Sequence, residues 1–275
     1  MVDKIFCVCY NYLIKRVGAG KMLTLLSSRK LPYDNYTTDQ IAGIFTTDHF
    51  IYLAVLITSI VVSLFLSRKI SPKTEKRIRL CIAITITVLE IIKIALRIYK
   101  QMGLETWLPL YFCSIFILAA WISLLPCKLI ANCGKSYIAT GGIIGAIFFC
   151  IYPNTSLVFF PALHPASIHS FIYHFLMLYS GIVLLWKGGY KPRAWDGLCY
   201  FALVSCVSVP SVILNVRLGT NCMFLRYPEG IPILKSIADA SPVLYTVLAL
   251  LVQGILLFYI VYGLYTLVLK NKDKS

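Results

Sequence analysis

Charged residues are scarce in this chain: only 13% of its 275 residues are Asp, Glu, Lys or Arg, and only 11 are acidic. A water-soluble domain usually has about 25% charged and about 45–50% apolar residues. Here the hydrophobic share is 59% and the mean hydropathy is +0.80, which excludes an ordinary soluble globular protein. The excess apolar surface has to face lipid.

The sequence also lacks the short motifs of several enzyme classes. It has no G-x-S-x-G nucleophile elbow, no P-loop, no H-E-x-x-H metal site, and no histidine followed four residues later by aspartate. Its ten cysteines show no zinc-ligand spacing, and half or more lie in apolar runs, where cysteine acts as a small hydrophobe. We therefore expect no metal, no diffusible cofactor and no disulfide framework.

Positive charge is in excess, with 26 Lys and Arg residues and a formal net charge of +15. These residues are scattered between apolar runs and form no continuous basic domain, which argues against nucleic acid as a partner. Basic loops that meet anionic lipid explain the same bias. Membrane lipids are thus the expected environment and substrate, and the oligomeric state stays open.

Seven apolar stretches predict an all-α fold, a polytopic integral membrane helical bundle of about seven transmembrane helices. The stretches cover residues 49–67, 78–99, 107–125, 137–152, 168–186, 196–217 and 242–268. Three glycines in the fourth stretch favour close helix packing over lipid contact. Outside the membrane domain 48–269, we expect an N-terminal tail with an interfacial helix at 1–47 and a short basic C-terminal tail at 270–275.

The loops indicate how the chain is oriented, because Lys and Arg are enriched in cytoplasmic loops. The segment from Arg68 to Arg79 carries six of them and is the best candidate for the cytoplasmic side. Alternation of the spans then predicts a cytoplasmic C-terminus in a cell membrane.

Polar side chains inside the spans mark a candidate site, because each costs free energy in hydrocarbon. At 1.5 Å per residue, Cys113 and His174 each lie roughly 9 Å below the outer face and Glu90 lies roughly 13 Å below it. Lys93 shares a helix face with Glu90. Three further polar residues towards the same ends of the later spans complete the layer: Asn215, Asn221 and Tyr245.

A thiol and an imidazole at matching depth form a nucleophile and base, since histidine can take the thiol proton and leave the reactive thiolate. The amides of Asn215 and Asn221 suit an oxyanion, and Glu90 with Lys93 suits the orientation of His174 or a lipid head group. Other interpretations stay open. A single Cys or His in an apolar helix is more often a packing residue, and the Glu90–Lys93 stripe also suits an ion pair that only joins helices.

Several segments resemble the YwaF-like integral membrane protein family of bacteria, whose eukaryotic relatives include a transmembrane phospholipid acyltransferase. The matching pieces are Leu108-Pro-Leu-Tyr-Phe-Cys113, Glu90-Ile-Ile-Lys93, Tyr173-His174-Phe175, Gly189-Tyr190-Lys191-Pro192, Asn215, Gly219-Thr220-Asn221-Cys222-Met223-Phe224-Leu225 and Ser241-Pro242-Val243-Leu244-Tyr245. Together they cover residues 45 to 268. The family motif commonly has histidine where Tyr111 stands here.

The resemblance implies acyl chemistry on lipids, with Cys113 as nucleophile and His174 as base. The expected function is therefore a thiol-dependent phospholipid acyltransferase or a lipid hydrolase that works within the membrane. The main alternative is a small-molecule transporter or a lipid-binding membrane protein without catalysis, in which Glu90 and Lys93 line a solute site. A non-catalytic assembly partner is a third.

Overall fold

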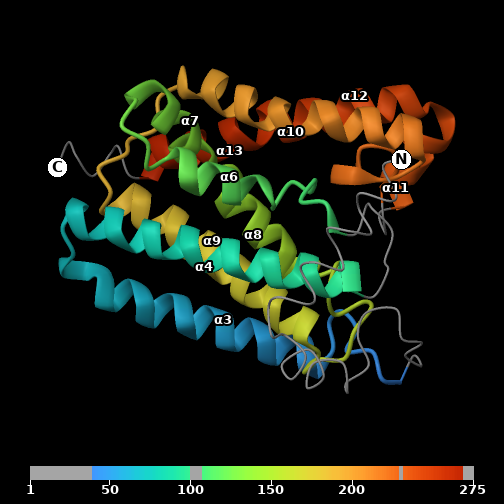
Figure 1. Cartoon of the computed structure of the whole chain (residues 1–275), viewed down its shortest axis with the longest axis horizontal. Helices are drawn as coiled ribbons and strands as arrows, with labels where there is room; N and C mark the ends of the chain where they lie inside the picture. The colour runs from blue at the N-terminus through green and yellow to red at the C-terminus, as the bar shows by residue number, and fades with distance from the viewer. Residues whose placement is uncertain (1–38, 100–106, 229–231, 269–275) are drawn as a thin grey trace.

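The computed structural model of the chain describes residues 39–99, 107–228 and 232–268. These residues form a bundle of helices with no strand among them (Figure 1), which confirms the expected all-α fold. Most of the predicted N-terminal tail and all of the C-terminal tail lie outside the described residues.

The helix boundaries follow the apolar stretches closely, with two exceptions at the third and fourth predicted spans. In chain order the helices are α3 (Thr47–Leu66), α4 (Pro72–Tyr99), α6 (Ile115–Ile122), α7 (Lys128–Ala139), α8 (Gly141–Ile151), α9 (Pro165–Trp186), α10 (Asp196–Leu218), α11 (Pro232–Ala240), α12 (Pro242–Leu251) and α13 (Leu257–Val268). A π-helical turn, Val252–Leu256, joins α12 to α13.

Five segments of the described chain are long and apolar enough to cross a membrane: Thr47–Lys69, Lys128–Ile151, Pro165–Trp186, Asp196–Leu218 and Pro242–Val268. The predicted seven are thus supported at five places. The second predicted span is α4, a helix of 28 residues that carries many charges, and the third contains the eight-residue helix α6.

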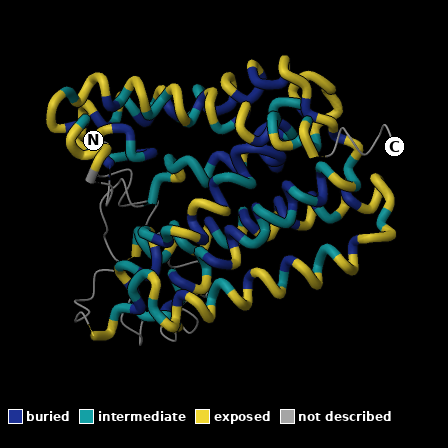
Figure 2. Tube along the Cα trace, turned by 180° about the vertical axis from the view of Figure 1, so that it is seen from behind, coloured by how far each residue is buried: buried dark blue, intermediate teal, exposed yellow. Residues whose placement is uncertain are grey.

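The helices lie in layers (Figure 1). α10 contacts α13 and the π-helical turn and lies alongside α12 on one side of the bundle, α6, α7 and α8 fill the middle, and α4, α9 and α3 form the other side. Figure 2 shows the buried residues concentrated in the middle layer and the exposed ones along the outer helices. Outer helices that expose apolar residues along their length are what a lipid environment requires.

The fourth span occupies the centre of this arrangement. It begins at Lys128, nine residues before the predicted start, and consists of α7 and α8 with a break at Thr140. Its glycines let neighbours approach: a Cβ on Gly134 would collide with the carbonyl oxygen of Ala119 in α6. A Cβ on Gly141, one of the three glycines of the predicted stretch, would lie 2.9 Å from the rings of Tyr137 and Tyr200, so the expected close packing is found there.

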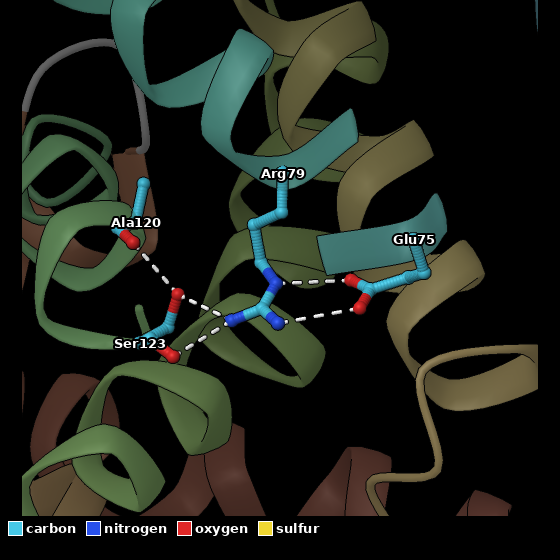
Figure 3. Close-up of polar contacts among 4 residues, drawn as sticks. All are labelled: Glu75, Arg79, Ala120 and Ser123. Atoms are coloured by element: carbon cyan, nitrogen blue, oxygen red, sulfur yellow. Dashed lines mark hydrogen bonds and ion pairs between the residues drawn. The ribbon is translucent and has the colours of Figure 1, made fainter. Parts of the chain in front are cut away.

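A buried ion pair fixes α4 against the end of α6 (Figure 3). The Arg79 guanidinium donates to both carboxylate oxygens of Glu75, at 2.9 and 3.2 Å, and to the carbonyl and hydroxyl oxygens of Ser123, at 2.9 and 2.7 Å. Arg79 is 4% exposed and Glu75 is 3% exposed. This cluster sets the position of α4, which carries Glu90 and Lys93 further along the same helix.

The connections that were predicted to share one side of the membrane do lie at one end of the bundle (Figure 1). The turn from α3 to α4, the link from α9 to α10 and the C-terminal end of α13 meet there. The first two carry Arg68, Lys69, Lys187, Lys191 and Arg193. The cytoplasmic assignment of this end remains a prediction.

Candidate functional site

Cys113 lies in an irregular segment of the third predicted span, just before α6. Pro109 disfavours a helix at the start of this segment, because proline lacks a backbone N–H and restricts the residue before it. Tight turns then lead into the helix: Ser114 N–H donates to the carbonyl of Tyr111 at 2.9 Å and Ile115 N–H to that of Phe112 at 3.2 Å. The thiol therefore sits on the chain where the span changes from irregular to helical.

Three other parts of the protein satisfy the exposed carbonyls of this segment. Met223 N–H donates to Leu110 at 3.1 Å, the Tyr173 hydroxyl donates to Cys113 at 3.1 Å, and the Tyr137 hydroxyl donates to Phe112. Irregular backbone at membrane depth is tolerated only where the protein supplies such partners. The segment is thus held rigidly by α7, α9 and the chain that follows α10.

His174, 61 residues further along the chain, faces the Cys113 thiol. Its Nε2 lies 3.3 Å from Sγ of Cys113, and its Nδ1 lies 2.7 Å from the carbonyl oxygen of Ser170. A carbonyl oxygen can only accept, so Nδ1 carries the proton and the Nε2 lone pair is directed at the thiol. This is the tautomer that a histidine needs to remove a thiol proton.

The imidazole is enclosed by aromatic rings. Phe149 of α8 stacks on it with ring centroids 3.7 Å apart and planes 5° from parallel, and Tyr173 meets it edge-on at 5.6 Å. His174 is only 6% exposed. Phe149 had no signal in the sequence that set it apart from other apolar residues of its helix, so this partner was missed.

Glu90 and Lys93 of α4 join the site from another side. Lys93 Nζ lies 2.5 Å from Oε1 of Glu90, with the lysine side chain 19% exposed and the glutamate 7%. Lys93 lies within electrostatic range of Cys113. The structure therefore brings Cys113 and His174 into contact and places the Glu90–Lys93 pair within electrostatic range of the thiol.

The side chains of Asn215 in α10, Asn221 and Tyr245 in α12 instead bond to the loop of residues 219–227. Asn215 donates to the carbonyl of Cys222 at 3.0 Å and accepts from the N–H of Cys222 at 2.7 Å and from Thr220 at 2.8 Å. The Asn221 side chain bonds the backbone of Arg226 and Tyr227, at 3.0 to 3.2 Å. Both amides organise this loop.

The 219–227 loop is folded back into the bundle. Met223 and Phe224 have φ of 56° and 54°, a left-handed conformation that is strained for residues other than glycine. Gln253 donates to the carbonyl of Met223 at 3.0 Å, and Tyr245 donates to that of Phe224 at 2.7 Å. Tyr245 thus holds the loop, and Met223 in turn holds the Cys113 segment through Leu110.

Replacing Asn215 with alanine is expected to destabilise the protein, because the buried N–H of Cys222 loses its partner. The Cys222 carbonyl loses one of two donors and still accepts from Leu225 N–H. An unsatisfied buried group costs about 1–3 kcal/mol, and we expect a loss of that size. The measurement is thermal unfolding of the purified chain in detergent, with Asn221→Ala, in a more exposed position, as the milder control. Unchanged unfolding with lost activity would instead place Asn215 at the reacting atoms.

The other histidines have other neighbours. His169 lies about 1.4 helical turns before His174, near the backbone of Leu89 and within electrostatic range of Lys93. His164 caps α9 by accepting from Ala166 N–H at 3.1 Å. His49 is fully buried and lies 2.9 Å from the carbonyl of Cys150. Within the described residues, no cluster of three or more His, Cys, Asp and Glu side chains is suited to a metal.

The fold and the site define a class: a helical integral membrane protein with a thiol and an imidazole in contact inside the bundle. The model of the TMEM164 family, a transmembrane protein family, matches residues 44–262. The chain therefore belongs to the TMEM164 family. No curated protein and no solved structure matches it.

Proposed function

We propose that this protein is a lipid acyltransferase in which Cys113 is the nucleophile and His174 the base. One observation carries the proposal: the 3.3 Å contact between Nε2 and Sγ, with the Nδ1 proton committed to Ser170. A nucleophile within reach of a base that a third group orients is the usual arrangement for covalent catalysis. The proposal includes seven crossings, with α4 and the segment from Trp107 to Ile122 as the second and third, and a cytoplasmic C-terminus.

In the first half of the reaction, Nε2 of His174 takes the thiol proton and the Cys113 thiolate attacks the carbonyl carbon of a lipid ester. The new C–S bond forms, the ester C–O bond breaks, and the leaving lysolipid oxygen takes the proton back from Nε2. The acyl group is then held on Cys113 as a thioester.

In the second half, an acceptor hydroxyl attacks the thioester while His174 Nε2 takes its proton. The C–S bond breaks and the sulfur recovers a proton from the imidazole, which returns the enzyme to its starting state. Aromatic side chains around His174 restrict water, so we favour a lysolipid hydroxyl over water as the acceptor.

Negative charge on the carbonyl oxygen needs a stabilising group during both steps. Lys93 is the cation that interacts with Cys113, and Glu90 holds its ammonium group at 2.5 Å. We therefore assign the electrostatic stabilisation to Lys93 and the orientation of Lys93 to Glu90. The amides of Asn215 and Asn221, which were expected to serve here, are bonded to the backbone of the 219–227 loop.

A labelled thioester tests this function directly. The full chain is reconstituted with phosphatidylcholine that carries an alkyne-tagged acyl chain, and covalent label that hydroxylamine releases is measured by mass. We expect the label on Cys113 in the native chain and in Cys206→Ala, which removes an exposed cysteine of α10. We expect none in Cys113→Ala.

The cellular counterpart is lipid profiling of cells with and without the protein. Cys113→Ser and His174→Ala variants that still insert into the membrane serve as the inactive comparisons. An acyl-chain composition that stays the same in all of these cells, together with no label on Cys113, would reject the enzyme function.

A further inference from the structure

A groove runs along the outside of the bundle between α3 and α9. Its volume is about 510 Å³ and its lining is mostly apolar and aromatic. From α3 the lining includes Tyr52, Val55 and Ser59, and from α9 it includes Phe171, Ile172 and Phe175. Serine at position 59 leaves room where a larger side chain of α3 would fill the groove.

The groove lies in the part of the protein that faces lipid. α3 exposes large apolar side chains along its length, among them Val55, Ile57 and Val61 at 59 to 60%. Both α3 and α9 start at the end of the bundle opposite the basic turns and run side by side (Figure 1). The lining of α3 extends from Tyr52 to Ser63, which is about 16 Å at 1.5 Å per residue.

That length is close to half of the roughly 30 Å hydrocarbon core, which is the thickness available to one acyl chain. The volume of the groove is about 510 Å³, and Ser59 and Ser63 are among the few polar residues of its lining. A single hydrocarbon chain is the occupant that suits this length, this apolar lining and the lipid around the two helices.

The inner wall of the groove is continuous with the candidate site. Phe171 stacks on Tyr52 with ring centroids 4.1 Å apart and meets Phe149 at 5.0 Å, and Phe149 stacks on His174 at 3.7 Å. One pair of phenylalanine rings thus separates the groove from the imidazole. A chain in the groove would bring its ester end towards the layer that holds Cys113.

We propose that the groove between α3 and α9 binds one acyl chain of a phospholipid. We further infer that the bound acyl chain belongs to the acyl donor. This assignment rests on the proposed function, whereas binding of an acyl chain in the groove does not. The lining from Val55 to Phe175 then sets which chain lengths are accepted.

The test uses the full chain in phosphatidylcholine vesicles that contain a small share of phosphatidylcholine with a diazirine midway along one acyl chain. After illumination, cross-linked residues are located by mass spectrometry. We expect the label to concentrate on the groove-facing residues of α3 and on residues 168–175. Ser59→Trp fills the groove and should remove most of this label, while Val61→Trp, on the exposed side of α3, should leave it unchanged.

Thermal unfolding checks that both tryptophan variants keep the fold. If Ser59→Trp does not fold, Val55→Phe at the rim narrows the groove less severely and takes its place. Label spread evenly over the exposed face of α3 and the groove would overturn the proposal, because it would show ordinary boundary lipid. If the groove is labelled specifically in Cys113→Ala as well as in the native chain, acyl-chain binding in the groove is supported independently of catalysis. If the proposed function also holds, Ser59→Trp shifts the transferred chains towards shorter ones.

Discussion

Replacement of His174 by glutamine is expected to lower the rate of acyl transfer by about 10²–10⁴-fold, the usual contribution of a general base. The glutamine amide keeps a polar group beside Ser170 but cannot take the proton of the Cys113 thiol. The thiolate is the reactive form, so the first half of the reaction should fail before the thioester forms. The measurement is the initial rate of label transfer in reconstituted vesicles.

His169→Gln is the matched control, because His169 lies on the same helix but near Leu89 on the α4 side. It should retain most of the activity. The transport alternative makes the opposite prediction: Cys113→Ala would keep function and Glu90→Gln would lose it, since a solute site needs the charge and not the thiol. That result would contradict the acyl-transfer mechanism.

Replacement of Arg79 by methionine is expected to destabilise the protein by about 3–5 kcal/mol, because it leaves the Glu75 carboxylate buried without its partner. A buried ion pair adds little stability compared with apolar side chains of similar size, but a single buried charge without its partner is strongly destabilising. The double variant Glu75→Leu with Arg79→Met should therefore recover much of the stability. Unfolding of the purified chain by heat or by added SDS measures both.

Arg77→Met is the control for this experiment, since Arg77 is exposed on the same turn of α4. It should have little effect on stability. If Arg79→Met unfolds at the same point as Arg77→Met, the contact with Glu75 and Ser123 contributes nothing, and α4 is held by its apolar contacts alone.

The lipid-facing helices were predictable because hydrocarbon favours an apolar side chain at each position of a span. α3, α9, α10 and the span from Pro242 to Val268 all begin and end within a few residues of the apolar stretches. Residues 128–136, nine of the twelve residues of α7, were missed for the opposite reason. Asn132, Lys135 and Ser136 lower the local hydropathy, yet the helix packs inside the protein, where other helices replace lipid as its surroundings.

The sequence predicted how deep in the membrane the candidate-site residues lie, but not which residues they contact. Residue counts placed Cys113, His174 and Glu90 in one layer, because rise along a helix is nearly constant. They could not show that Asn215 would bond to Cys222 of the 219–227 loop, since that bond depends on how the loop folds back. Nor could they show Phe149 against His174, which joins residues of α8 and α9.

The amino-acid sequence was enough to predict a helical membrane protein and to single out the few polar residues in its apolar spans. Both follow from the cost of placing polar groups in hydrocarbon, which acts on each residue separately. The tertiary structure alone decided that Cys113 leaves the helix, that His174 faces it in the proton-accepting tautomer, and that a groove beside α3 reaches the same layer. Those features depend on packing between helices far apart in the chain, and residue periodicity carries no information about them.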